Sequence, residues 1–255
     1  MGNSWAGLVL DDYRAVLPLP FQSTAGVRWV VRPPFTQQCG PWGKFTDQDT
    51  ERLLTAIPIQ YVLVDWPLNE RVARCSNKWF SLVPRTNLVV DTGQSYDHLR
   101  QGYSRSVTRY LKKYAPGQQQ MLTTEETIRT YRLEAGRRAG LRDKHYAIVH
   151  RLIDAAVSNG AGRTVGYFSA EGQYLAGGFF PEHRGRMINL FAGSTEAGYR
   201  DRGMARLIDH LLAERAGAPG LFDFEGSDII SIQQFFRGFG ATDRPYYRAR
   251  RWPLR

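Results

Sequence analysis

Apolar residues alternate with turn-forming residues at the start of the chain, which indicates a small antiparallel sheet. Short apolar segments cover residues 7–10, 15–19 and 27–31. Asp11-Asp12 separates the first pair, and Ser23 to Gly26 separates the second pair. Runs of this length with such breaks are typical of an antiparallel meander.

A helix and more strands follow and complete a first lobe. Thr46, with Asp49 three positions later, predicts the start of a helix that ends near Ile57. Further strands are predicted at residues 60–66, 79–84 and 87–91. We therefore expect one domain over residues 1–92 and a second over residues 93–255.

The second lobe is expected to begin with helices and to continue with a sheet. Ser95 is a candidate cap of a long helix from Tyr96 to about Tyr114, and Thr124 and Asp143 are candidate caps of two more. The elements expected after these helices are strands at 163–170, 173–180 and 186–192, a helix opened by Arg200 to Ala205, a strand at 221–224, a helix at 229–237 and a last strand at 246–252. Helices of this kind should cover the sheet.

The long helix has one strongly basic side. Arg105, Arg109, Lys112 and Lys113 lie on or near one face of it. Such a run is explained either by a solvated helix face or by contact with phosphate or RNA.

The composition indicates the net charge of the protein and the cellular compartment that we predict for it. With 42% hydrophobic residues the chain is a folded protein, and its net charge of +10 suits either solubility or a phosphate-bearing partner. The two cysteines, Cys39 and Cys75, have no metal-ligand spacing. The histidines are scattered, so we predict no metal site. No apolar run reaches the length of a membrane span and no signal peptide is visible, so we predict a cytoplasmic protein.

The start of the helix near Gly203 is a candidate phosphate site. Gly203 and Ala205 are small, so a ligand could approach the backbone there. The unpaired N–H groups and the dipole of a helix N-terminus favour a phosphate. The alternative is a plain helix start in a compact domain.

The order of these elements resembles a known fold. Three antiparallel strands, the pattern Arg200-x-x-Gly203-x-Ala205 at a helix start, and then strand, helix and strand are similar to the acyl-coenzyme A N-acyltransferase (GNAT) fold. The two-lobe plan and the segments Leu221 to Ser227 and Phe235 to Ala241 resemble the Fem-type branch, whose members transfer aminoacyl or acyl groups to amines. This resemblance implies an α/β (α+β) protein with tandem GNAT-like lobes. Each lobe would have a mixed, mainly antiparallel sheet flanked by helices, and the first lobe would lack its opening elements.

The resemblance also implies a donor site. In that superfamily the Arg/Gln-x-x-Gly-x-Gly/Ala segment binds the coenzyme A pyrophosphate through backbone N–H groups. The residues that would hold acyl-coenzyme A here are Leu190, Arg200, Arg202, Gly203, Met204 and Ala205. Aminoacyl-tRNA is the alternative donor, and Arg105, Arg109, Lys112 and Lys113 would contact it.

Acyl transfer to an amine needs a base, and two carboxylates are candidates. Asp223 and Glu225 lie two residues apart at a strand end, so both should face the same way. The alternative is that one caps the following helix and the other pairs with an arginine. Tyr246, on the last strand, corresponds to the tyrosine that can protonate a leaving thiolate in the superfamily, although a tyrosine in such a strand is also typical of a core.

Two functions follow from these observations. The first is a cytoplasmic acyltransferase that moves an acyl or aminoacyl group to a small-molecule or peptide amine. The second is a catalytically inactive GNAT-fold protein that binds a nucleotide, RNA or a protein partner through its basic helix.

Overall fold

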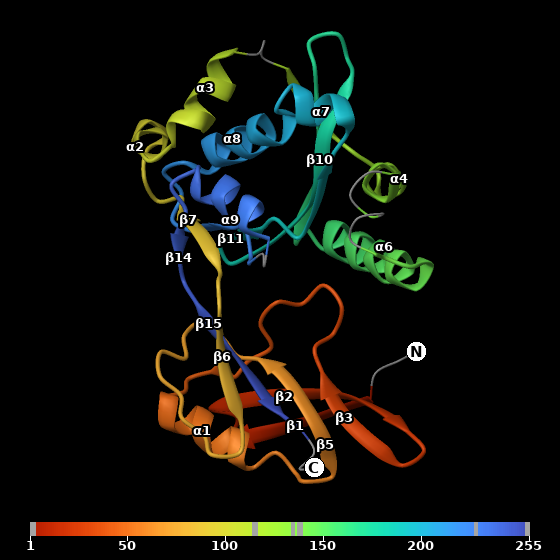
Figure 1. The fold of residues 1–255 in the computed structure, drawn as a ribbon, viewed down its shortest axis with the longest axis vertical. Coiled ribbons are helices and arrows are strands. Elements are labelled where there is room, and N and C mark those ends of the chain that lie inside the picture. Colours follow the sequence, from red (N-terminus) through yellow and green to blue (C-terminus); the bar gives the residue numbers. More distant parts are fainter. Residues whose placement is uncertain (1–3, 114–116, 134–135, 137–139, 227–228, 253–255) are drawn as a thin grey trace. The chain divides into compact units, whose positions relative to one another are not determined.

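The chain divides into two compact units, each with its own sheet (Figure 1). The structure, a computed structural model, describes residues 4–113, 117–133, 136, 140–226 and 229–252. Residues 1–87 and 244–255 form the first unit, and residues 88–243 form the second. The sequence predicted a division between residues 92 and 93. In the structure the strand of residues 88–91 belongs to the second unit, and the end of the chain from residue 244 belongs to the first.

The first unit is a seven-stranded sheet with one helix. Its elements are β1 (Ser4–Leu10), β2 (Ala15–Thr24), β3 (Val27–Val31), β4 (Trp42–Gly43), α1 (Asp47–Thr55), β5 (Tyr61–Pro67), β6 (Ser81–Arg85) and β15 (Tyr246–Arg251). The strands lie in the order β1-β2-β3-β5-β15-β6, and β4 pairs with β2. The predicted meander is confirmed, because β1, β2 and β3 are antiparallel neighbours.

The capping residues of α1 are as predicted. The hydroxyl of Thr46 accepts the N–H of Asp49, and the Asp49 carboxylate accepts the N–H of Thr46. This reciprocal pair fixes the first turn of α1. The helix then buries Leu53 and Leu54 in a core that also contains Trp66.

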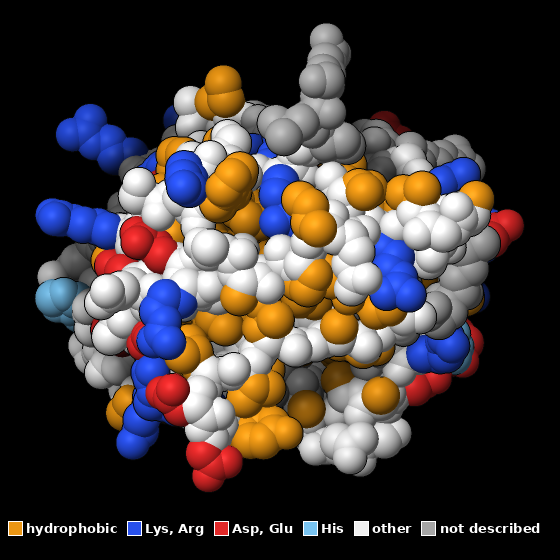
Figure 2. Space-filling view, turned by 90° about the horizontal axis from the view of Figure 1, so that it is seen from below, with side chains coloured by type: hydrophobic (Ala, Val, Ile, Leu, Met, Phe, Trp, Pro, Cys, Tyr) orange, Lys and Arg blue, Asp and Glu red, His pale blue; other side chains and the backbone are white. Residues whose placement is uncertain are grey.

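Part of the apolar surface of the first unit stays exposed. Trp5 on β1 and Trp79 are more than half exposed, at 67% and 54%. Figure 2 shows one face of the molecule, on which hydrophobic side chains lie among Lys and Arg side chains.

The sequence predicted that the last strand completes the sheet of the second lobe, but the structure places it in the first unit. β15 pairs antiparallel with both β5 and β6 of the first unit. The Arg248 guanidinium pairs with the Asp65 carboxylate, and Ala249 is fully buried in the core. Two ladders of hydrogen bonds and a buried side chain therefore hold β15 in the first sheet.

The second unit has an eight-stranded sheet in the order β14-β7-β13-β11-β10-β9-β8, with β12 paired to β10. Its strands are β7 (Leu88–Asp91), β8 (Gln118–Met121), β9 (Gly162–Phe168), β10 (Tyr174–His183), β11 (Arg186–Ile188), β12 (Phe191–Ser194), β13 (Leu221–Asp223) and β14 (Thr242–Asp243). Its helices are α2 (Tyr96–Gln101), α3 (Arg105–Lys113), α4 (Thr124–Leu133), α6 (Asp143–Ser158), α7 (Glu196–Arg200), α8 (Gly203–Arg215) and α9 (Ile230–Arg237). Only β11 and β13 pair in parallel among the described strands of this sheet. The protein is therefore mixed α/β with two mostly antiparallel sheets, as predicted.

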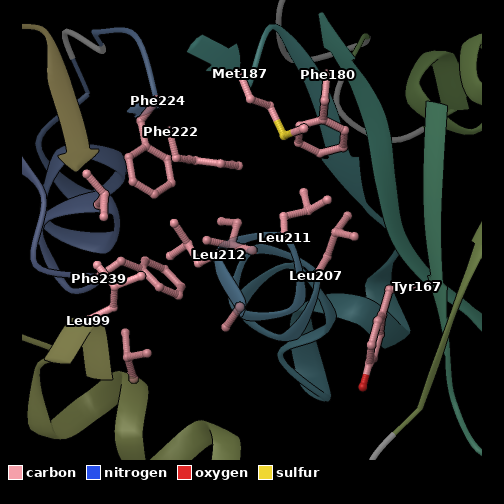
Figure 3. Packing of buried hydrophobic residues seen from close by; sticks show 14 of the residues in the cluster. Leu99, Tyr167, Phe180, Met187, Leu207, Leu211, Leu212, Phe222, Phe224 and Phe239 are labelled. Carbon is pink, nitrogen blue, oxygen red and sulfur yellow. The ribbon is translucent and has the colours of Figure 1, made fainter. Parts of the chain in front are cut away.

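Helices cover both faces of the second sheet. Helix α8 lies on one face, while α4 and α6 lie on the other (Figure 1). The strand pleat explains this arrangement, because Phe180 belongs to the core around α8, while Phe179, the residue before it, points to the other face. Figure 3 shows Leu207, Leu211 and Leu212 of α8 in the same core as Phe180, Phe222 and Phe239. One face of α8 is therefore buried in the core of the second unit.

The predicted long helix after Ser95 is two helices. Ser95 caps α2 as expected, but α2 ends at Gly102, and α3 begins after Ser104, whose hydroxyl accepts the N–H of Val107. A second cap within the segment is the reason for the break. The predicted end near Tyr114 lies outside the described residues.

Candidate functional site

The predicted phosphate loop is built from two short elements. Thr195 caps α7, and its hydroxyl accepts the N–H of Gly198. Arg202 then adopts the left-handed conformation (φ 59°) immediately before α8 begins at Gly203. The chain therefore turns sharply between α7 and α8, and Arg200 to Ala205 contain this turn and the start of α8.

Packing explains the two glycines of this loop. A Cβ atom on Gly203 would lie 2.6 Å from the Cβ of Leu175 on β10. A Cβ on Gly198 would lie 1.7 Å from the carbonyl oxygen of Leu175. Both glycines are therefore required for α7 and α8 to approach β10, whether or not a ligand binds.

The remaining residues predicted to hold a donor differ in exposure. Arg200 and Arg202 are exposed, and Leu190 and Met204 are half-buried. Ala205 is buried against the core, and its backbone N–H already donates to the carbonyl oxygen of Arg202 at 3.0 Å. Arg200 and Arg202 are therefore the side chains of this set that are most accessible to a ligand.

The basic helix lies beside this loop. The Arg202 guanidinium carbon lies 4.6 Å from the ring centre of Tyr110 on α3, and Arg206 of α8 donates to the carbonyl oxygen of Leu111. Tyr103, just before α3, donates to Asp209 of α8. The structure thus brings together two segments that the sequence singled out separately.

A groove on α3 carries the positive charge. It has a volume of about 480 Å³ and is lined by Tyr103, Arg105, Thr108, Arg109, Lys112 and Lys113. Among the described residues no ion pair involves Arg105, Arg109 or Lys112. The groove is therefore cationic and can bind a phosphate group.

The tyrosines next to the groove are not acids at neutral pH. Burial, together with the neighbouring Asp209 carboxylate, raises the pKa of Tyr96 to about 12. The same causes, in the same order, raise the pKa of Tyr103 further. Both hydroxyls therefore stay protonated and donate to Asp209, which fixes α2 and α3 to α8.

Strands β11 and β13 separate beyond Asp223. They pair in parallel from Arg186 and Leu221 to Ile188 and Asp223, and the N–H of Asn189 donates to the Asp223 carbonyl at 2.8 Å. Beyond that point β12 pairs only with β10 among the described strands. The two strands therefore diverge beyond Asp223.

Asn189 is a feature of this divergence that sequence reasoning missed. Its side-chain oxygen is buried and has no hydrogen-bond partner in the described part of the chain. The signal was a single polar residue inside the apolar run Met187 to Phe191. A buried acceptor without a donor is uncommon and marks a position that a ligand donor could fill.

Asp223 has a structural explanation. It is 1% exposed, and Nε and Nη2 of Arg186 lie 2.7 and 2.6 Å from its Oδ2. Its Oδ1 accepts the N–H of Glu225 at 2.7 Å. Pairing with an arginine, the alternative to catalysis, is what the structure shows for Asp223.

Glu225 does not continue the pleat. β13 ends at Asp223, and Glu225 is left-handed with φ 58°, so the expectation that both carboxylates face the same way does not hold. A non-glycine residue in this conformation costs about 1–2 kcal/mol. The hydrogen bonds to Asp223 and from the N–H of Leu88 hold the backbone there. A strained, half-buried carboxylate at a strand end is a candidate functional group.

Tyr246 belongs to the other unit. It is the first residue of β15 and is 7% exposed. It lines a pocket of the first unit with Tyr247. The two carboxylates and Tyr246 are therefore parts of different compact units.

The described residues offer neither a metal site nor a membrane span. In residues 4–252, apart from the stretches not described, no group of three or more His, Cys, Asp or Glu side chains is arranged to hold a metal ion. Within the same residues, every helix is too short or too polar to cross a membrane.

Comparisons with known proteins give structural matches only. No protein-family model matches the sequence, and no curated protein sequence matches it significantly. FemX has a TM-score of 0.64 at 10% identity, over 95% of this chain and 88% of FemX. The C-terminal domain of a putative lysylphosphatidylglycerol synthetase from Agrobacterium fabrum has a TM-score of 0.54 at 11% identity, over 98% of this chain and 84% of that domain.

A third match is a GCN5-related N-acetyltransferase from Kribbella flavida. It has a TM-score of 0.51 at 14% identity, over 99% of this chain and 91% of that protein. At such low identity the likeness concerns the fold. The chain therefore has the fold of FemX and of this GCN5-related N-acetyltransferase, with two GNAT-like lobes in tandem.

Proposed function

We propose that this protein is an acyltransferase that moves an acyl or aminoacyl group from a phosphate-bearing donor to an amine. The observation that supports this most directly is the cationic groove of α3 beside the start of α8. The fold of FemX and of a GCN5-related N-acetyltransferase is compatible with it.

The donor we propose is acyl-coenzyme A. Its phosphates match Arg105, Arg109 and Lys112, and Arg202 extends the positive surface to the first turn of α8. The dipole at the start of α8 would add a favourable interaction with a phosphate. When bound, acyl-coenzyme A supplies a thioester carbonyl that an amine can attack.

The chain would contribute a base and its positioning. The amine nitrogen forms a bond to the acyl carbon, the carbon–sulfur bond breaks, and the amine proton must leave. Glu225 is our candidate for the group that accepts this proton, and Asp223 positions it by accepting its backbone N–H. A positioned base of this kind typically contributes a factor of about 10² to 10⁴.

A binding experiment tests the donor site. The double variant Arg109→Glu and Lys112→Glu should weaken coenzyme A binding by about tenfold or more, because it reverses two charges on the groove. The matched control is Lys144→Glu with Arg151→Glu, which changes the same charges on α6, where both residues are exposed. Isothermal titration calorimetry at low salt measures both.

Two results would contradict the donor site. One is equal loss of affinity in the α6 control, which would indicate an effect of net charge alone. The other is no binding of coenzyme A to the unmodified protein at millimolar concentration. Binding of tRNA with a steep salt dependence in that case would favour aminoacyl-tRNA, because many phosphate contacts release many counterions.

A second candidate function is binding without catalysis. It is favoured by two observations: Asp223 is engaged by Arg186, and Gly203 has a packing role that needs no ligand. Mass spectrometry of a mixture of amines incubated with acyl-coenzyme A separates the two functions. Donor binding without any acylated product would favour the binding function.

A further inference from the structure

The loop after β5 in the first unit is held by an unbroken series of hydrogen bonds. Every backbone N–H from Leu68 to Arg74 donates to an acceptor. The acceptors include the carbonyl oxygens of Tyr247 and Gly40 and both carboxylate oxygens of Asp47. A loop with all its amides satisfied is rigid, which is unusual for a surface connection.

Side chains add a closed ring to this loop. Gln37 donates to Asn87, Asn87 donates to Glu70, the Glu70 N–H donates to Gln38, and Gln38 donates to Gln37. Asn87, one of the four members of the ring, is fully buried. The ring joins three separate stretches of chain and fixes the position of Glu70 and of its neighbour Arg71.

The rigid loop forms one wall of a pocket of about 410 Å³. Glu70, Arg71, Arg244, Tyr246 and Tyr247 are its polar and aromatic lining, and small apolar side chains complete it. The volume falls within the range of about 300–1,000 Å³ that is typical of small-molecule sites. All of these residues belong to the first unit.

The two arginines of the lining have no carboxylate partner in the described part of the chain. The Arg71 guanidinium lies 4.6 Å from the ring centre of Phe45, and its Nη1 donates to the carbonyl oxygen of Gly43 at 3.2 Å. These contacts orient the group but leave its charge uncompensated. Among the described residues no ion pair involves Arg71 or Arg244.

The charges of the lining select the class of ligand. Two guanidinium groups and one carboxylate leave the pocket with one net positive charge, which attracts an anion and which a single carboxylate compensates. Arginine binds a carboxylate through two parallel N–H donors. The lining atoms of Tyr246 and Tyr247, together with the small apolar side chains, provide an apolar surface for the body of the ligand.

We propose that this pocket binds a small monocarboxylate with an aromatic or aliphatic body, its carboxylate on Arg71 and Arg244 and its body against Tyr246 and Tyr247. The site takes a ligand other than the phosphate-bearing donor, and it does not depend on the proposed function, because its test measures binding alone.

Isothermal titration calorimetry with 3-phenylpropionate tests the proposal. A dissociation constant on the order of 1 mM is expected for a ligand of this size. The uncharged 3-phenylpropanamide and inorganic phosphate should each bind at least about tenfold more weakly, because one lacks the charge and the other lacks the body.

Variants connect the binding to the pocket. Arg71→Ala and Arg244→Ala should each weaken 3-phenylpropionate binding by about tenfold or more. Arg74→Ala is the matched control, because Arg74 is an exposed arginine of the same loop that does not line the pocket, and it should bind as the unmodified protein does. Arg71→Lys keeps the charge without the two-donor geometry and should give an intermediate affinity, provided that circular dichroism shows each variant folded.

The following outcomes would overturn the proposal. One is that the unmodified protein does not bind 3-phenylpropionate at a concentration about tenfold above the expected dissociation constant. Others are that 3-phenylpropanamide binds as tightly as 3-phenylpropionate or that phosphate binds more tightly. The last is that Arg74→Ala loses as much affinity as Arg71→Ala and Arg244→Ala do.

Discussion

The ion pair between Arg186 and Asp223 can be tested by removing its cation. Arg186→Met keeps much of the side-chain length but removes the guanidinium, whose Nε and Nη2 lie 2.7 and 2.6 Å from Oδ2 of Asp223. The Asp223 side chain is 2% exposed, so its charge would lose its partner in a buried environment. Loss of one partner of a buried pair typically costs about 3–5 kcal/mol.

The expected value lies at the lower end of this range. The Arg186 side chain is 26% exposed, so solvent already screens part of the interaction. We expect the free energy of unfolding to fall by about 3 kcal/mol. For a unit of this size that corresponds to a Tm lower by about 6–12 °C.

Urea unfolding followed by circular dichroism measures the change. The control is Arg151→Met on α6, an exposed arginine whose replacement should stay within about 0.5 kcal/mol of the unmodified protein. Asp223→Asn and the double variant with Arg186→Met complete a cycle. Because Asp223→Asn removes the buried charge that Arg186→Met would leave uncompensated, the double variant should lose less than the sum of the single variants.

Two results would refute this interpretation of Asp223. One is a loss below about 1 kcal/mol in Arg186→Met, which would mean that the pair contributes no more than a surface pair does. The other is a strictly additive double variant. If Asp223→Asn instead stays stable and loses turnover per folded molecule, Asp223 acts on the substrate.

Three other changes test the remaining features. Gly203→Ala should lower the free energy of unfolding by about 1–3 kcal/mol in urea titrations, because its Cβ would lie 2.6 Å from a side-chain carbon of β10, whereas Gly7→Ala, with its nearest atom at 3.9 Å, should not. Hydrogen bonds from Arg14 hold the pKa of Asp49 below its usual range, so the stability that Asp49 adds is present above about pH 4 and is lost as pH falls further. The Tm difference between the unmodified protein and Asp49→Asn should therefore shrink from pH 6 to pH 3, and a constant difference would contradict this. Glu225→Gln should lower turnover by about 10² to 10⁴ with unchanged donor affinity, and a lower Tm with normal turnover would reassign Glu225 to a structural role.

The helix cap and the strand order at the start of the first unit could be predicted because they depend on residues close together in the sequence. The capping box of Thr46 and Asp49 involves residues three apart, and the turns between β1, β2 and β3 join neighbouring strands. Each of these contacts is determined within a few residues. Sequence patterns therefore predicted them correctly.

Long-range pairing could not be read in the same way. The segment at 246–251 has the pattern of a strand, and nothing in the pattern says which sheet it joins. Its place depends on strands and side chains far away in sequence, such as β5, β6 and Asp65, which pairs with Arg248. A resemblance based on the order of elements therefore placed this strand in the second sheet, and the observed hydrogen bonds place it in the first.

The glycines of the predicted phosphate loop show why a motif alone does not establish a site. A small residue at a helix start allows either a ligand or a strand to approach the backbone, and both require the same residue. The distance from Gly203 to Leu175 shows that a strand occupies that space. The case for a donor site therefore moves from the glycines to the charges around them. The Arg202 guanidinium packs on the Tyr110 ring and connects the start of α8 to the groove lined by Arg105, Arg109 and Lys112. A substitution at Gly203 would disturb folding as well as binding. Removing positive charge from α3 is therefore the change that tests donor binding separately from folding.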